Sequence, residues 1–508
     1  MANVHFSSQM ASSVPVIRTG VLLDRARALY EVGDRSQART ICRQILLADP
    51  LNTDGLTLLG ATLADDQRLD QALSTFDDVI RIAPADVTAW YNRGILLAKL
   101  GHAAEALASF DRVIELRPGN DSGHTQRAIT LCLLGRFEEA LMAFDRVQAL
   151  SGMDGALAIN RGVALLGSGR PVEAIASHDL ALTLDPGNAK ALANKGMAMM
   201  LLGDYPGGGL LYEARWTSGQ LAPKRQWPRP LWLGQSSLAG KTILLHDEQG
   251  LGDALQFCRY ATLAAQAGAR VILMVEPPLA TLMETLRGVS RVLTFADEMP
   301  DHDLQCPLMS LPLAFGTTLD TIPAEIPYLC ADPSRAAEWE NRLAGLPGRR
   351  IGLVWSGASR AGHQVFVASN QRRSTSLTAL APLAAVRGCS FVSVQVGAPA
   401  QEARSPPAGM VLHDYTEALR DFADTAALIE NLDLVIGVDT SVVHLAGAMG
   451  KPVWLLNRFD TCWRWLLNRD DSPWYPTLRQ FRQQRPGDWA GVVGQVAHAL
   501  HAFAGARI

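Results

Sequence analysis

The stretch VTAWYNRGILLAKLGHAAEALASFDRVIELRPGN (residues 87–120) is one unit of a pattern that returns every 34 residues through the first 220 residues of the chain. Its eighth position is small in every unit: Ala26, Gly60, Gly94, Ala128, Gly162 and Gly196. A second small position lies twelve residues later: Ala38, Ala72, Ala106, Ala140, Ala174 and Gly208. Four residues further the side chain is mostly large: Cys42, Phe76, Phe110, Phe144, His178 and Tyr212. Such a repeat predicts a stack of similar units rather than one globular core.

Each unit fits a pair of antiparallel helices. The small positions let the two helices approach closely, and the large position fills the space between neighbouring hairpins. Proline closes most units because the residue before a proline is pushed out of the helical region. The pattern resembles the tetratricopeptide (TPR) repeat over residues 19–222. That resemblance implies a superhelix whose concave groove binds a protein or peptide, which can itself be the acceptor of a reaction.

Two features of the array leave alternatives open. Asn92, Asn160 and Asn194 share the sixth position of their units, where they can hydrogen-bond a bound peptide. The alternatives are solvated polar residues, or an array that serves dimerisation, so a homo-oligomer stays open. In the sixth unit, Gly207-Gly208-Gly209 is expected to weaken the second helix by roughly 1 kcal/mol per glycine. The array is therefore expected to decay there and to pass into a linker at residues 223–240.

Composition bounds the rest of the interpretation. The 508 residues carry a net charge of -4, which argues against a nucleic-acid partner. Seven cysteines without CxxC spacing give neither a disulfide framework nor a zinc site, and a reducing compartment is the simplest interpretation. No apolar run is long enough for a membrane span, and no secretory signal is evident. The sequence thus predicts a soluble, cytoplasmic protein with no metal.

From residue 241 onward, strand-like apolar runs alternate with helical patterns, which predicts parallel sheets. We divide this region into two halves, residues 241–345 and 346–508. The predicted fold class is therefore α plus α/β: a TPR α-solenoid followed by a pair of Rossmann-like domains. A nucleotide site is expected in the cleft between the two halves.

The stretch HDEQGLGDALQF (residues 246–257) follows the first predicted strand and allows three interpretations. A nicotinamide site is opposed by Leu255, which replaces the third glycine of GxGxxG, and by Asp253, whose charge would repel pyrophosphate at a helix start. In a second interpretation Gly250 and Gly252 shape a turn and Asp253 caps the helix. In a third, the carboxylate of Asp253 takes a proton from an acceptor hydroxyl.

The second half carries LVIGVDTSVVHLAGAMGKPVWLL (residues 434–456). A buried strand ends at Asp439, Thr440 and Ser441 follow at a helix start, and His444 lies one turn along. Free backbone N–H groups, two hydroxyls and an imidazole make a cradle for a diphosphate. The alternative is a capping cluster with an ordinary core histidine.

Together the two stretches resemble the GT-B glycosyltransferases, most nearly the bacterial heptosyltransferase family. That family carries GxGD in its first half and DTGxxHLAxAxGxP in its second; here they read GLGD (250–253) and DTSVVHLAGAMGKP (439–452). The repeats ahead of such a domain are similar in layout to the O-linked N-acetylglucosamine transferases. The resemblance implies an inverting transfer from a nucleotide diphosphate sugar to a protein or glycan hydroxyl, without a metal or other cofactor.

The resemblance also implies roles for single residues. Asp253 would be the catalytic base, and Gly250 and Gly252 would lie beside the donor. The donor phosphates would be gripped by Asp439, Thr440, Ser441 and His444. Ser441 departs from the glycine of the family, which leaves the identity of the donor open.

Further candidates come from their positions. Arg373 or Arg372, with Arg373 favoured, would neutralise the departing diphosphate. Gln395 and Gly397 end a strand where a base or ribose would bind. Possible substrate contacts are His363 in a loop, and Trp463 and Trp465, whose rings would stack on a sugar or merely pack.

A rival interpretation is a non-enzymatic TPR scaffold whose C-terminal region keeps the fold but not turnover. The two interpretations differ in one respect: the enzyme requires Asp253, and the scaffold does not.

Overall fold

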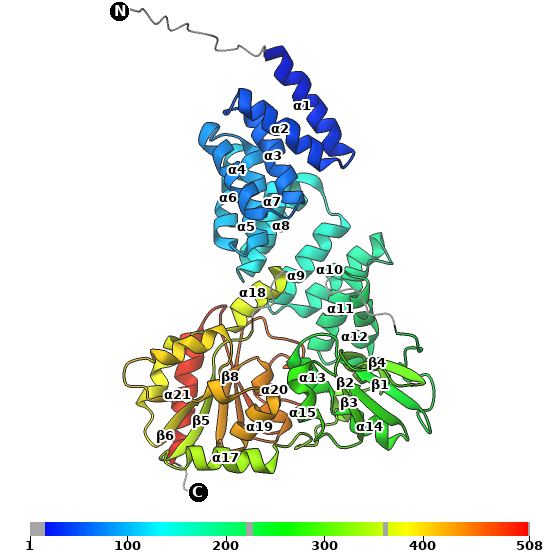
Figure 1. The fold of residues 1–508 in the computed structure, drawn as a ribbon, viewed down its shortest axis with the longest axis vertical. Helices are drawn as coiled ribbons and strands as arrows, with labels where there is room; N and C mark the ends of the chain where they lie inside the picture. The colour runs from blue at the N-terminus through cyan, green and yellow to red at the C-terminus, as the bar shows by residue number, and fades with distance from the viewer. Residues whose placement is uncertain (1–15, 220–226, 359–363, 506–508) are drawn as a thin grey trace, which may run out of the picture. The chain divides into compact units, whose positions relative to one another are not determined.

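A computed structural model describes residues 16–219, 227–358 and 364–505 (Figure 1). The chain divides into two compact units. The first ends at Leu134 and also includes Met142–Gly152, and the second comprises Gly135–Leu141 and everything from Met153 onward. The last helical hairpins therefore belong to the same compact unit as the α/β region.

The first unit is a stack of helical hairpins, as the repeat predicts. Its helices are α1 (Val16–Glu31), α2 (Arg35–Ala48), α3 (Thr53–Asp65), α4 (Leu69–Ile82), α5 (Val87–Leu100), α6 (Ala103–Leu116), α7 (Asp121–Leu133) and most of α8 (Phe137–Ser151). Within a hairpin the small and large positions meet. A Cβ on Gly60 would lie 2.8 Å from the Phe76 ring, and one on Gly94 would lie 2.6 Å from the Phe110 ring. These glycines are required because the ring occupies the space of a side chain.

Ion pairs join consecutive hairpins of the array. Arg93 Nε donates to Asp77 Oδ1 at 2.7 Å, and Arg127 Nε donates to Asp111 Oδ1 at 2.6 Å. In each case the base precedes the eighth-position residue of one unit and the acid follows the large residue of the unit before it. Sequence analysis missed this ladder, although its residues recur with the repeat.

The second unit begins its own helices with α9 (Gly155–Gly167), α10 (Pro171–Leu184), α11 (Ala189–Leu201) and α12 (Tyr205–Tyr212). The expected decay of the sixth repeat is wrong, since α12 forms across the three glycines. A Cβ on Gly208 would lie 2.6 Å from the carbonyl oxygen of Gly196. The glycine therefore lets α11 and α12 pack at backbone distance. Asn194 on α11 is only 2% exposed, so the groove role predicted for it does not hold.

The first sheet has four parallel strands in the order β3-β2-β1-β4. They are β1 (Thr242–His246), β2 (Arg270–Met274), β3 (Val289–Leu293) and β4 (Leu304–Pro307). The helices of this part are α13 (Leu251–Phe257), α14 (Tyr260–Gln266), α15 (Ala280–Met283), α16 (Leu311–Ala314) and α17 (Pro333–Leu343). Part of the predicted linker packs beside this sheet, because Trp232 is buried and its N–H donates to the Gln305 carbonyl at 2.8 Å.

The second sheet has six parallel strands in the order β10-β9-β8-β5-β6-β7. They are β5 (Arg349–Val354), β6 (Cys389–Ser393), β7 (Leu412–Asp414), β8 (Leu434–Val438), β9 (Val453–Asn457) and β10 (Leu478–Arg482). The helices are α18 (Gln364–Arg373), α19 (Phe422–Glu430), α20 (Ser441–Ala448) and α21 (Trp489–Gly505). Sequence analysis missed the edge strands β7 and β10, and it expected a polar loop where α18 lies.

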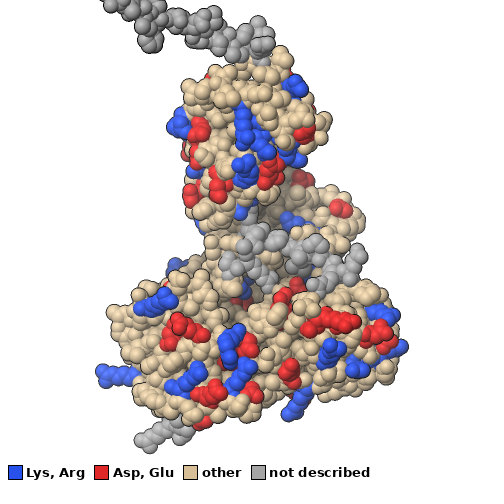
Figure 2. Space-filling view, viewed as in Figure 1, with Lys and Arg blue, Asp and Glu red and all other residues tan. Residues whose placement is uncertain are grey.

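The surface and the cysteines agree with the composition. Figure 2 shows basic and acidic side chains intermingled on the visible face, without a field of one sign. All seven cysteines are free. Over the described ranges, no helix is both long and apolar enough to cross a membrane.

Candidate functional site

The GLGD turn joins β1 to α13. Gly250 is the N-cap of α13, and Asp253 is the third residue of the helix. The Gly250 N–H donates to Asp253 Oδ2 at 2.9 Å, so this carboxylate reaches back over the helix start. The expectation that Asp253 itself begins the helix is therefore wrong by two residues. The capping interpretation and the reactive one are compatible at this point, because only one oxygen makes the cap.

The other oxygen of Asp253 is also engaged. Asp253 Oδ1 lies 2.5 Å from Arg464 Nη2, and the two side chains are 20% and 10% exposed. Burial lowers the pKa of Arg464, yet the Asp253 carboxylate, with smaller contributions from Cys462 and Tyr212, raises it above its ordinary value. Arg464 is thus a charged partner of Asp253 that sequence analysis missed. The only signal was its position between two aromatic residues.

The second motif lies at the carboxyl end of β8. Thr440 is the N-cap of α20, which begins at Ser441. His444 Nε2 lies 3.6 Å from Asp439 Oδ1, and its Nδ1 hydrogen-bonds to the Tyr475 hydroxyl at 3.0 Å. Burial raises the pKa of Asp439, but the hydrogen bond and charge of His444, with Arg373 and Arg458, hold that pKa well below its usual range. Asp439 is therefore an anion that orients the imidazole.

Thr440 is unusual for a helix N-cap. Its side chain makes no capping hydrogen bond. The residue is 7% exposed, and among the described residues its hydroxyl has no hydrogen-bond partner. Buried hydroxyls without a partner are uncommon and call for an explanation. An anion at the start of α20 would satisfy both the hydroxyl and the first N–H groups of the helix, which have no intrahelical partner.

The two motifs meet at Gly252. A Cβ there would lie 2.9 Å from His444 Cδ2 and 3.5 Å from the Ser441 Cα. The first turn of α13 therefore packs directly on the first turn of α20. Gly252 is needed for this approach, because any side chain would displace the imidazole. Asp253, Ser441 and His444 are thereby brought together from two different sheets.

The two candidate arginines at the end of α18 differ in their surroundings. Arg373 Nε donates to Asn370 Oδ1 at 3.1 Å, and its charge acts on Asp439. Arg372 Nε donates to Asp460 Oδ2 at 3.0 Å, and its guanidinium lies 5.7 Å from the centre of the Phe137 ring. The structure therefore brings Arg373 toward the second motif and engages Arg372 elsewhere.

Arg458 was missed by sequence analysis. It directly follows β9, and its charge also acts on Asp439. Its Nη1 donates to Ser369 Oγ at 2.7 Å and lies 3.6 Å from Asp460 Oδ2. Its place after a strand of a parallel sheet, where ligands usually bind, was the signal that could have found it.

Several predicted contacts are not open to a ligand. The Gln395 amide oxygen accepts the N–H groups of Trp355 at 3.0 Å and Ser356 at 2.8 Å, and its nitrogen donates to the Val396 carbonyl. Its side chain thus holds the backbone after β5. Trp463 and Trp465 are 6% and 0% exposed, which corrects the expectation that their rings face a sugar.

Two further predicted contacts remain. Gly397 is exposed and has a positive φ of 79°, so it shapes the turn after β6. His363 lies outside the described residues.

A buried ionic cluster lies behind the GLGD turn. Arg215, in the 3-10 helix Glu213–Trp216, donates to both oxygens of Glu248 at 2.9 and 2.8 Å. The same guanidinium lies 2.5 Å from Glu213 and donates to Ser310 Oγ at 2.8 Å. Burial lowers the pKa of Arg215, but Glu248 and Glu213 raise it above its ordinary value. The segment that ends the helical hairpins therefore fixes the loop that carries Asp253.

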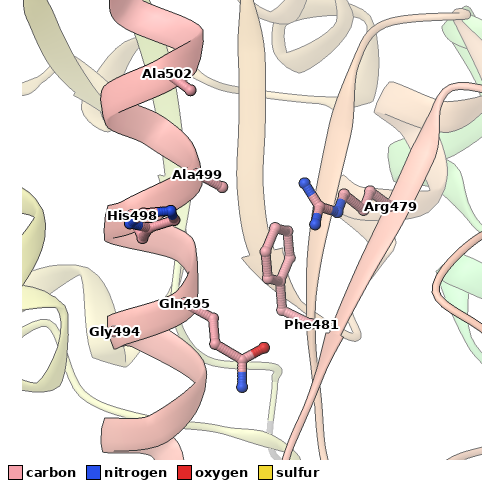
Figure 3. A pocket seen from close by; sticks show the side chains of 7 residues that line it. All are labelled: Arg479, Phe481, Gly494, Gln495, His498, Ala499 and Ala502. Carbon is pink, nitrogen blue, oxygen red and sulfur yellow. The ribbon is translucent and has the colours of Figure 1, made fainter.

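A cavity of about 630 Å³ lies elsewhere, between β10 and α21 (Figure 3). It is lined by Arg479, Phe481, Gly494, Gln495, His498, Ala499 and Ala502. None of these residues belongs to either motif. We therefore place the candidate site at the meeting of α13 and α20, where the chemistry converges, and not in this cavity.

Comparison with protein families supports both parts of the chain. Two models of the tetratricopeptide repeat match, one over residues 59–130 and the other over residues 23–87 and 128–189. The family described as glycosyltransferase family 9 (heptosyltransferase) matches residues 420–456, from α19 to β9. The chain is thus a TPR solenoid followed by a parallel-sheet α/β region that contains a glycosyltransferase-family segment.

Individual relatives are more distant. Protein FlbA of Caulobacter vibrioides is 28% identical over 330 residues, which cover 60% of this chain and 54% of that protein. The match therefore spans about half of the relative. A TPR protein from Parabacteroides merdae is 17% identical, with a TM-score of 0.35 over 41% of this chain and 80% of that one. MamA of AMB-1 is 24% identical, with a TM-score of 0.31 over 34% of this chain and 94% of that one. At these TM-scores the two structural matches carry no argument.

Proposed function

We propose that this protein is an inverting, metal-independent glycosyltransferase of the GT-B type, which moves a sugar from a nucleotide diphosphate sugar to an acceptor hydroxyl. The observation that carries the proposal is the contact of the two motifs at Gly252 and His444. A proton acceptor and an anion cradle are thereby adjacent, as a single displacement at a sugar carbon requires. The heptosyltransferase match over α20 supports the same reaction class.

The start of α20 would hold the donor diphosphate. Its free N–H groups and the Thr440 hydroxyl donate hydrogen bonds to phosphate oxygens, and Arg373 supplies positive charge. Negative charge develops on the diphosphate as the bond to the sugar breaks, and fixed donors stabilise that charge without reorganising. The carboxylate of Asp439 does not oppose the phosphates directly, since it is 3.6 Å from His444 Nε2 and orients that ring.

Asp253 would act on the acceptor. The acceptor oxygen forms a bond to the anomeric carbon, and the bond between that carbon and the diphosphate oxygen breaks. The hydroxyl proton passes to the Asp253 carboxylate, and the electron pair of the broken bond leaves with the diphosphate. One displacement inverts the anomeric centre.

The helical array would recruit the acceptor, a protein or a glycan, or a partner that presents it. A non-enzymatic scaffold remains the second candidate. It is favoured by the engagement of both Asp253 oxygens, one by the Gly250 N–H and one by Arg464, because such a carboxylate is a weaker base.

Thermal stabilisation by nucleotides tests the proposal. The chain is heated with UDP, GDP, ADP and dTDP and with their common sugars, with and without EDTA, next to His444→Ala and Asp253→Asn. A ligand at a hundred times its Kd stabilises a fold by about 2.7 kcal/mol. We expect one nucleotide to stabilise the unaltered chain and Asp253→Asn, with or without EDTA, and to lose its effect in His444→Ala.

Each outcome bears on one part of the proposal. Stabilisation that EDTA abolishes would contradict metal independence. Binding without release of free nucleoside diphosphate by any acceptor tried, water included, would favour the scaffold. No stabilisation by any of these nucleotides would refute the assignment of α20 as a donor site.

A further inference from the structure

We infer that Arg464 is a positioning residue for the reaction: it holds the carboxylate of Asp253 in place from the opposite half of the α/β region. This inference rests on the proposed function, because it gives Arg464 a part in the step that Asp253 performs. Asp253 lies on α13 beside the first sheet, whereas Arg464 follows β9 of the second sheet. The 2.5 Å ion pair thus joins the two halves at the candidate base.

The guanidinium of Arg464 has one available orientation. It lies 4.4 Å from the centre of the Trp463 ring and 5.8 Å from that of Phe257, which is one turn beyond Asp253 on α13. A second nitrogen, Nη1, donates to Cys462 Sγ at 2.9 Å. Aromatic faces and a second acceptor therefore fix the fork before it reaches the carboxylate.

The neighbours of Arg464 contact both motifs. The Trp463 ring stacks on Phe257 of α13 with centres 5.9 Å apart, and the Trp465 ring stacks on His444 of α20 with centres 5.0 Å apart. Three consecutive residues, 463–465, therefore touch the helix of the predicted base and the helix of the predicted donor site. Ordinary core packing explains the two tryptophans, but it does not require a buried arginine between them.

The backbone beside this segment is strained. Leu466, which is only 5% exposed, has a φ of 58°, and Asn468 has a φ of 55°. A left-handed conformation is unfavourable for a bulky residue and persists only where the surroundings enforce it. Arg482 Nη2 donates to the Leu466 carbonyl at 3.1 Å and so helps to hold this conformation. Such strain is frequent where a loop must place a functional side chain.

The ion pair has a chemical consequence. A guanidinium beside a carboxylate favours its ionised form, so Arg464 keeps Asp253 ready to accept a proton over a wider range of pH. Other charged or titratable groups also surround the pair, and a variant of Arg464 leaves them in place. They are Glu248, Arg215, Tyr212, Cys462 and His444.

The test measures release of nucleoside diphosphate from UDP-, GDP-, ADP- and dTDP-sugars with water as acceptor, and donor affinity by calorimetry. The variants are Arg464→Met, Arg464→Lys and Asp253→Asn. Arg469→Met is the matched control, since Arg469 lies in the same segment and pairs with Asp471 at the surface. We expect Arg464→Met to slow release about 100-fold while donor Kd changes less than about 3-fold. Arg464→Lys should recover part of the rate, and Arg469→Met should match the unaltered chain.

Two further readouts separate positioning from simple stabilisation. The acidic limb of the pH–rate profile should move to higher pH in Arg464→Met, because the cation that favours the carboxylate is gone. The double variant Asp253→Asn/Arg464→Met should be no slower than Asp253→Asn alone. If Arg464→Met does not fold, Arg464→Lys, which keeps the charge, decides by the same readouts.

The outcomes distinguish the inference from the proposed function. A chain that releases nucleoside diphosphate equally fast with Arg464→Met overturns the inference alone. Parallel losses of rate and donor affinity, or additive effects in the double variant, do the same, because they indicate a structural role. A chain that cleaves none of the four donor classes overturns the proposed function and the inference with it.

Discussion

The ion pairs of the helical array and those behind the GLGD turn use the same chemistry in opposite surroundings. Arg127 and Asp111 meet at 2.6 Å with their side chains 28% and 43% exposed. Arg215 and Glu248 meet at 2.8 Å with theirs 1% and 2% exposed. Water screens the first pair and is excluded from the second. Distance alone therefore says little about what an ion pair contributes.

The difference also separates repetition from specificity. The array pairs recur with the repeat, and each replaces similar contacts between a side chain and water. The buried pairs occur once, and each fixes the loop that carries Asp253. Removing one partner of a buried pair leaves a charge without compensation, which is far more costly than losing the pair itself.

Arg215→Met should have the largest effect on stability. It leaves Glu248 and Glu213 in a dry site without their cation, so we expect a loss of about 3–5 kcal/mol. Urea unfolding followed by tryptophan fluorescence measures it. The double variant Arg215→Met/Glu248→Leu should recover part of the loss, because one buried charge is gone. A loss below about 1 kcal/mol would mean that water enters this cluster, and the comparison would fail.

His178→Phe tests a buried polar group inside the array. His178 stands at the position that holds Phe76 and Phe110 in earlier repeats, and it is fully buried. Burial, with Lys190 and Lys195 and against Asp179, lowers the pKa of His178 to about 4. The unfolded chain binds this proton near pH 6.5, so the native protein loses stability as pH falls from about 6.5 to 4.

We therefore expect His178→Phe to be the more stable chain at pH 4.5 by about 2–3 kcal/mol, and to differ much less at pH 7.5. Melting temperatures at the two pH values provide the measurement. Asp179→Asn is a useful comparison, because it removes a neighbouring charge and leaves the buried ring. A difference that does not change with pH would show that His178 takes up its proton in the folded protein.

Gly252→Ala tests the contact between the two motifs. The new Cβ would lie 2.9 Å from His444 Cδ2, so the imidazole must move. We expect nucleotide binding to weaken about 10-fold, which corresponds to about 1.4 kcal/mol. Gly494→Ala is the control, since a Cβ there meets nothing within 4 Å. Unchanged binding in Gly252→Ala would separate the GLGD turn from the donor site.

The smallest effect is expected at the surface of the array. Arg127→Met, Asp111→Ala and the double variant give a cycle whose coupling energy should lie below about 1 kcal/mol and vanish in 1 M salt. Urea unfolding at two salt concentrations measures it. A coupling above about 2 kcal/mol would show that the array depends on its ion ladder as strongly as the site depends on Arg215.

Periodic features were predictable from the sequence, and single long-range contacts were not. The helical repeat followed from spacing alone, and the central strands followed from apolar runs such as residues 242–246 and 434–438. The edge strand β7 has three residues, too few for a pattern. The helix α18 was missed because its residues are polar and it lies where a loop was expected.

The site was predicted in outline, with its partners missing. The sequence names Asp253 and His444 but cannot tell that Gly252 lies against His444, because that contact joins two sheets. Arg464 and Arg215 carry no local pattern, and their importance comes from burial beside a carboxylate. Gln395 was misjudged for the same reason, since a strand-end amide can face a ligand or hold its own backbone.

The close packing of α11 on α12 bears on how freely the repeats can be exchanged. Because Gly196 and Gly208 meet at backbone distance and Arg215 reaches Glu248, the last two hairpins are parts of the α/β unit rather than of a detachable array. A chimera that replaces the repeats should therefore join the foreign array near Gly152 and keep everything from Met153 onward. Duplication or loss of repeats can change the first four hairpins, while the last two are tied to the chemistry that they support.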